Sequence, residues 1–114
     1  MASIPDLDVE KIRRYCASRM PAEHAAEWRI ECTVRGRSVT LFDCRAPGSG
    51  DIGPEWTRVP IAQLRFDTSS HAWSICWADR NSRWHPYPYN EIEPGSIDDM
   101  LTEIESDPTA IFWG

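Results

Sequence analysis

The first apolar residues of the chain follow a helical period. They recur three or four positions apart, which places them on one face of an α-helix: Val9, Ile12, Cys16 and Met20. Charged residues fill the positions between them, so the pattern predicts an amphipathic helix that opens at Pro5 and Asp6. Pro21 disfavours a helical conformation of the residue before it and predicts the end of this helix.

The next segment alternates apolar and polar residues, the pattern of a strand with one buried face. Every second residue is apolar between residues 27 and 35. Gly36-Arg37 fits a two-residue turn, after which Ser38–Arg45 returns in a register that keeps the apolar face continuous. In this register Cys32 and Cys44 project from opposite faces of the hairpin, so they cannot share a disulfide or a metal ion.

A Gly- and Pro-rich segment at residues 46–55 has no periodicity and is predicted to be a surface loop. Residues 56–67 follow as a third strand. Pro60 within it cannot donate a ladder hydrogen bond, so this part is predicted to be an edge or a bulge. Ala62, Leu64 and Phe66 are expected to point inward.

A second hairpin is predicted over residues 72–89. Its first strand, residues 72–78, shows the best strand alternation in the chain, and the turn signals at residues 79–82 predict a four-residue turn. That turn length places Cys76 opposite His85. Two prolines near the end of the returning strand confine it to an edge of the sheet.

The end of the chain has the signals of a second helix. Ser96 with Asp99 three residues later resembles a helix N-cap, and an apolar stripe follows until Asp107-Pro108 ends the pattern. The apolar tail 110–114 is expected to dock on the sheet. The elements predict one α+β domain over residues 1–114, a twisted antiparallel meander of about five strands flanked by an N-terminal and a C-terminal helix.

The composition is that of an ordinary soluble domain, with 41% hydrophobic and 26% charged residues. No apolar run has membrane-spanning length, and the first residues lack the pattern of a secretion signal. The four cysteines are widely spaced with no C-x-x-C pair, so neither a metal site nor a cofactor is predicted from them. We therefore expect a cytoplasmic protein with free thiols.

Acidic residues are concentrated at the end of the chain. The formal charge is -6, which disfavours general binding to nucleic acid or anionic lipid. Residues 84–114 contain seven acids and neither Lys nor Arg. A solvated helix face explains such a run, and an acidic docking surface for a basic partner along Ile97–Glu105 is the alternative.

Two sequence blocks carry a resemblance to a known family. They are WSICWADRNSRWHPY at residues 73–87 and DPTAIFWG at residues 107–114. With these blocks the chain resembles the bacterial family described as domain of unknown function 3024. The resemblance extends over nearly the whole chain and implies a small bacterial cytoplasmic domain. It implies no activity.

The second hairpin concentrates polar chemistry in a short segment. Seven residues are candidates for a site there: Asp79, Arg80, Asn81, Arg83, Trp84, His85 and Tyr87. A carboxylate, an amide, guanidinium groups and an imidazole together are the kinds of group used in metal and phosphoryl sites. The structural alternative is a turn in which Asp and Asn side chains bond their own backbone, and turn sequences favour it.

Cys76 and His85 are a second candidate pair. Opposite each other on two strands, they could form a thiolate and imidazolium pair, the arrangement that activates a nucleophilic cysteine. On a covered sheet face the same residues would be a buried thiol and a hydrogen-bonded core histidine, which is the more common outcome.

Six tryptophans are an unusually large number for a chain of this length. Large aromatic side chains build a core from few residues, and this explanation is favoured. The alternative is a partly exposed groove in which Trp84, Tyr87 and Tyr89 alternate with prolines, as in surfaces that bind peptides.

The leading functional hypothesis is a non-catalytic binding or protein-interaction module that uses the aromatic and arginine surface of residues 79–89. Its partner would be a protein or a small molecule, and nucleic acid is disfavoured by the net charge. The alternative is a small metal-dependent hydrolase or nuclease-like enzyme centred on four of these residues: Asp79, Asn81, Arg83 and His85. A homodimer formed through the proline-bearing edge strand or the apolar tail is a third, structural possibility.

Overall fold

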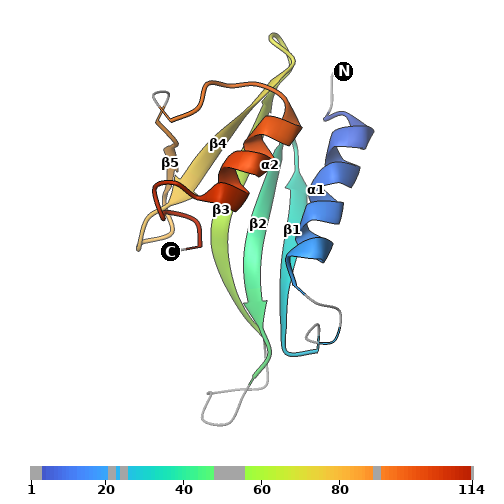
Figure 1. The fold of residues 1–114 in the computed structure, drawn as a ribbon, viewed down its shortest axis with the longest axis vertical. Coiled ribbons are helices and arrows are strands. Elements are labelled where there is room, and N and C mark those ends of the chain that lie inside the picture. The colour runs from blue at the N-terminus through green and yellow to red at the C-terminus, as the bar shows by residue number, and fades with distance from the viewer. Residues whose placement is uncertain (1–3, 21–22, 24–25, 48–55, 89–90, 114) are drawn as a thin grey trace.

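The computed structural model describes residues 4–20, 23, 26–47, 56–88 and 91–113. Its elements follow the order α1 (Asp6–Arg19), β1 (Trp28–Arg35), β2 (Ser38–Arg45), β3 (Thr57–Asp67), β4 (Ala72–Ala78), β5 (Trp84–Pro86) and α2 (Ile97–Ser106). The five strands form one antiparallel sheet in sequence order (Figure 1). The predicted α+β meander with a helix at each end is confirmed.

Two sequence predictions fall partly outside the described residues. They are the loop at residues 46–55, of which only the first two residues are described, and Tyr89 of the predicted last strand. That strand is also shorter than predicted, because β5 ends at Pro86.

Both helices pack against the same face of the sheet (Figure 1). Their buried side chains are Val9, Ile12 and Cys16 from α1 and Ile97, Met100, Leu101 and Ile104 from α2. The strands add alternate residues such as Leu41, Leu64 and Ile75 to this core, as the period of a strand requires.

The opposite face is covered by no helix of the described residues, and we call it the helix-free face. The side chains that the register places on it include Arg29, Glu31, Arg35, Thr40, Phe42, Cys44, Arg58, Gln63, Arg65, Asp67, Ser74, Cys76, Trp84 and Pro86.

The first three strands behave largely as predicted. Cys32 pairs with Leu41, and Cys44 pairs with Arg29, so the two thiols lie on opposite faces as predicted. Pro60 lies at a register shift opposite Phe42, where a bulge tolerates its missing N–H group. Of the two predicted roles for this segment, the bulge is confirmed and the edge is wrong, because β3 lies in the middle of the sheet.

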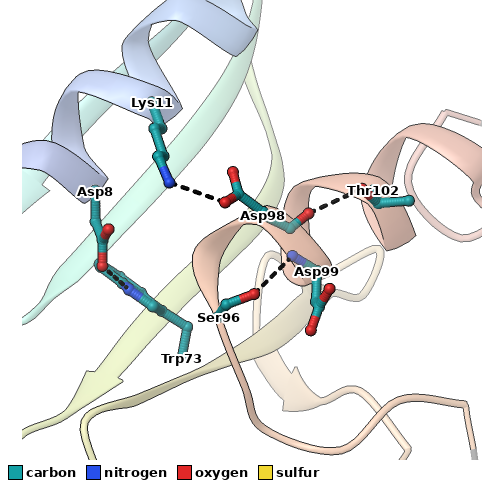
Figure 2. A network of polar contacts seen from close by, with 7 residues as sticks. All are labelled: Asp8, Lys11, Trp73, Ser96, Asp98, Asp99 and Thr102. Carbon is teal, nitrogen blue, oxygen red and sulfur yellow. Dashed lines mark hydrogen bonds and ion pairs between the residues drawn. The ribbon is translucent and has the colours of Figure 1, made fainter.

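A polar network joins the two helices to each other and to the sheet (Figure 2). Lys11 of α1 forms an ion pair of 2.8 Å with Asp98 of α2. The indole N–H of Trp73 on β4 donates to Asp8 of α1 at 2.8 Å. The backbone N–H of Asp99 donates to the hydroxyl of Ser96, which confirms the predicted N-cap of α2.

The apolar tail docks on the core, where its contacts include Arg19 of α1, Ile104 of α2 and Tyr87 just beyond β5. Asp107 organises it, because its carboxylate accepts hydrogen bonds from the backbone N–H groups of residues 111–113. Phe112 is buried against the ring of Tyr87, with ring centroids 5.2 Å apart. The indole N–H of Trp113 donates to the carbonyl of Ile104 at 3.0 Å.

Candidate functional site

The turn of the second hairpin is built around the side chain of Asp79. Its Oδ1 atom accepts hydrogen bonds from the backbone N–H groups of Asn81 at 2.8 Å and Arg83 at 3.0 Å. The backbone N–H of Asp79 donates to the carbonyl of Arg83, and Ser82 adopts a positive φ of 60°. Asp79 therefore holds the turn together, as the structural interpretation of this segment requires.

The turn has five residues instead of four, and this corrects the predicted register. Trp84 pairs with Ala78, which leaves residues 79–83 in the loop and shifts every later pair by one position. Cys76 consequently lies opposite Pro86, and His85 lies opposite Trp77. A shift of one residue moves each side chain to the other face of the sheet.

The predicted Cys76 and His85 pair is therefore wrong. Cys76 lies on the helix-free face, whereas His85 points to the face that carries the helices. Burial raises the pKa of the Cys76 thiol, and the residue is only 4% exposed. These surroundings favour the neutral, unreactive thiol.

His85 instead contacts both Asp79 and Trp77. Its Nε2 atom lies 2.7 Å from Oδ2 of Asp79, and its ring stacks on the indole of Trp77 with centroids 4.7 Å apart. The hydrogen bond from His85 and those from the turn backbone lower the pKa of Asp79. Both oxygens of this carboxylate are thus occupied by contacts within the hairpin.

Tyr87 lies in the core and contributes no exposed ring. It is 5% exposed, and its hydroxyl donates to Oε2 of Glu103 at 2.8 Å. Burial, together with the hydrogen bond to Glu103, raises the pKa of Tyr87 to about 12. The predicted groove of alternating aromatic side chains therefore keeps only Trp84 among the described aromatic residues of this segment.

Trp84 differs from the other five tryptophans. Each of those has a hydrogen bond, a cation or a stacked ring as a partner: Trp28, Trp56, Trp73, Trp77 and Trp113. Trp84 is partly exposed and has none of these contacts among the described residues. It lies on the helix-free face, beside the exposed turn residues Arg80, Asn81 and Arg83.

A hollow of about 220 Å³ opens next to this part of the sheet. Pro86 lines it, and Pro86 points to the same face as Trp84, two residues away. Most of its other lining is apolar, with Arg65 and Ser74 as its polar members. Arg65 donates from Nε to the side-chain oxygen of Gln63 at 2.7 Å and makes no ion pair among the described residues.

Arginines outnumber acids on the helix-free face. Its described residues include four arginines, Arg29, Arg35, Arg58 and Arg65, against the acids Glu31 and Asp67. Among the described residues, only Arg29 of the four has an ion pair, with Glu31. The guanidinium of Arg58 lies 4.2 Å from the ring centroid of Phe42, a cation–π contact that leaves its charge uncompensated.

The comparisons with known proteins give one result. The model of the family described as domain of unknown function, DUF3024, matches residues 2–114. The chain belongs to the DUF3024 family. That description assigns no activity to DUF3024 members, so the family leaves the role of the helix-free face open. No curated protein and no solved structure matches the chain.

The described residues hold neither a cluster of metal-binding side chains nor a membrane-spanning helix. Nowhere in this part of the DUF3024 chain do three or more His, Cys, Asp or Glu side chains gather in a way that could hold a metal ion. Its helices are also too short or too polar to cross a membrane.

Sequence reasoning missed Arg65 and the hollow beside it. The sequence shows Arg65 as a polar residue between Leu64 and Phe66 of the third strand. Because those two point inward, the alternation places Arg65 on the opposite face. The hollow lies beside β4, where the chain bonds to Ile75 at Tyr87 and returns to pair Gly95 with Trp73. No local sequence pattern signals such a return.

Proposed function

We propose that this chain is a non-catalytic binding module that recognises an acidic segment of a protein partner with the helix-free face of its sheet. Trp84 is the anchor of this surface. The observation that carries the proposal is that its partly exposed indole has no partner within the described chain. Tryptophan and arginine are the side chains most enriched among residues that dominate binding energy at protein interfaces.

The charge of the face supports an acidic partner. Arg35, Arg58 and Arg65 make no ion pair with a described acid, so carboxylates of a partner can approach them without displacing an internal ion pair. Arg80 and Arg83 are exposed at the adjacent turn and extend the cationic surface. The hollow beside Pro86 accommodates one apolar side chain of the partner segment.

The geometry gives less support to the hydrolase alternative. Asp79 uses its carboxylate for the turn backbone and for His85, so the group that would bind a metal or a water is already engaged. His85 points to one face of the sheet, whereas Asn81 and Arg83 lie exposed in the loop. These residues do not converge on one position for a reacting atom.

The cysteines bear on where the module works. All four are unpaired, as expected in a reducing compartment, and we place the module in the cytoplasm on this basis.

Selection of displayed peptides tests the proposal without a known partner. Random short peptides on phage are selected on the native chain, and binding of the enriched peptides to the native chain and to Trp84→Ala is then measured. We expect the enriched peptides to be acidic and to bind the native chain at least about tenfold more tightly than Trp84→Ala. Sedimentation of the chain alone at the same concentration measures any self-association through the β5 edge.

A pair of arginine variants controls the test. Arg65→Gln on the helix-free face should weaken peptide binding and reduce its dependence on salt, because it removes an unpaired charge. Arg14→Gln on the exposed side of α1 should change neither. Enriched peptides that bind Trp84→Ala as tightly as the native chain would contradict the proposal. Trp84-dependent binding of a single-stranded oligonucleotide at physiological salt would replace it with nucleic-acid recognition.

A further inference from the structure

Two cysteines and an arginine meet between α1 and the edge strand β1. Cys16 on α1, Cys32 on β1 and Arg13 line a single hollow of about 300 Å³. β1 is the outermost strand of the sheet, so this hollow is reached from the side of the molecule. It is separate from the hollow beside Pro86 and shares no lining residue with it.

The two thiols interact with each other and differ in exposure. Cys32 is partly exposed, whereas Cys16 is only 5% exposed. The neighbouring Cys32 side chain and burial raise the pKa of Cys16. The neighbouring Cys16 side chain, helped by Arg13 and opposed by burial and by the Glu31 carboxylate, lowers the pKa of Cys32 to about 7.

We propose that Cys16 and Cys32 form a dithiol site that reduces hydroperoxides and closes to a disulfide between α1 and β1. The roles follow from the geometry. Cys32 is the attacking thiol because it is the accessible one and lies beside a guanidinium. Cys16 is the resolving thiol because it is buried, lines the same hollow as Cys32 and is closed to large reagents.

The chemistry balances with a hydroperoxide as the oxidant. The Cys32 thiolate attacks one peroxide oxygen, the O–O bond breaks, and the leaving oxygen takes a proton to form water or an alcohol. Cys32 is then a sulfenic acid. Cys16 loses its proton and attacks the Cys32 sulfur, the S–O bond breaks, and the leaving hydroxide takes that proton to form a second molecule of water. Two thiols are oxidised and one peroxide is reduced.

The chain contains its own internal controls. Cys44 and Cys76 are 1% and 4% exposed, and burial raises the pKa of each thiol. They should therefore react slowly under conditions in which Cys32 reacts fast.

The first experiment uses the native chain and hydrogen peroxide. After treatment of the reduced chain, intact mass spectrometry should show a loss of about 2 Da per monomer, the two hydrogens of one disulfide. Peptide mapping should place that disulfide between Cys16 and Cys32, with Cys44 and Cys76 still free. A disulfide between two chains, or four free thiols after treatment, would overturn the proposal.

Variants separate the two roles. In Cys16→Ala the sulfenic acid on Cys32 should persist and be trapped by dimedone, and Cys16→Ser replaces this variant where it fails to fold. Arg13→Gln should slow alkylation of Cys32 by iodoacetamide several-fold at about pH 7 and leave it nearly unchanged at about pH 10. Arg14→Gln is the matched control and should alter neither rate. Equal alkylation rates for Cys32 and Cys44 in the native chain would also overturn the proposal.

Discussion

The two faces of the sheet use the same kinds of side chain differently. On the face that carries the helices, Trp73 is 1% exposed and its indole N–H donates to Asp8. On the helix-free face, Trp84 is partly exposed and has no such partner among the described residues. One tryptophan completes the core, and the other is available for an interaction outside the chain.

Charged residues on the helical side of the molecule and on the helix-free face also differ in how many partners they have within the chain. Three of the four acids of α2 contact side chains of the same chain: Asp98 pairs with Lys11, Glu105 accepts from Tyr15, and Glu103 accepts from Tyr87. These three acids therefore join α2 to α1 and to the segment after β5. Arginines of the helix-free face have no comparable set of partners, and this contrast separates the stabilising face from the proposed binding face.

The largest expected effect comes from truncating the core tryptophan. Trp73→Ala should lower the free energy of unfolding by about 3–5 kcal/mol, because it leaves a cavity under both helices and removes the partner of Asp8. Trp84→Ala should cost about 1 kcal/mol or less, as expected for a partly exposed side chain. Urea denaturation of both variants measures the difference, and equal losses would remove the distinction between the two faces.

The next-largest expected effect is a loss of folding stability at alkaline pH. Burial and acceptor carboxylates raise the pKa of both Tyr15 and Tyr87, to about 12 in the case of Tyr87. A phenol with a raised pKa in the folded state stabilises the fold fully below its unfolded pKa, and this stabilisation is lost as the pH rises through the folded pKa. Stability should therefore fall between about pH 10 and pH 12, by on the order of 1–2 kcal/mol for Tyr87.

Absorbance of the phenolate against pH, with unfolding followed at each pH, measures this alkaline loss. Tyr87→Phe keeps the ring contact with Phe112 and should flatten the decline. An unchanged decline in that variant would show that the hydroxyl of Tyr87 is not what holds α2 in place.

A smaller effect is expected at the N-cap of α2. Ser96→Ala should lower the stability by about 1 kcal/mol, because the backbone N–H of Asp99 loses its acceptor. Thr102→Ala is the control within the same helix, where the hydroxyl donates to the carbonyl of Asp98 and alanine is a good helix former. Thermal unfolding of the two variants should shift for the cap only, and equal shifts would contradict its role.

The smallest effect is expected for the ion pair between the helices. Lys11 and Asp98 are both exposed, so their coupling in a double-mutant cycle should be small and should vanish at high salt. The pKa of Lys11 is raised, chiefly by its hydrogen bond to Asp98. A large, salt-independent coupling would mean that this pair contributes to stability as a buried contact does.

Local patterns were sufficient for most of the fold. Periodicity and the Pro5, Pro21 and Ser96 signals located the helices, and alternation with a Gly36-Arg37 turn gave the register of the first hairpin. The predicted register of the second hairpin was wrong because Asp79 closes a five-residue turn through its side chain. The residue types of this turn predict where it lies in the chain but not how many residues it contains.

The candidate site was only partly predictable for the same reason. A shift of one residue in the turn moved His85 to the face of the core and separated it from Cys76. The position of Tyr87 depends on a contact with Phe112, and the hollow beside Arg65 depends on pairing between Trp73 and Gly95. Such contacts join distant parts of the chain, and no alternation or spacing announces them.

The indole N–H signals of the six tryptophans in a two-dimensional ¹⁵N–¹H NMR spectrum test the central claim most directly. They report both faces of the sheet in one measurement as an acidic peptide selected on the chain is titrated in. We predict that the Trp84 signal shifts with peptide concentration and that the Trp73 signal, held by Asp8, stays in place. A Trp84 signal that does not move while the peptide binds would contradict the account.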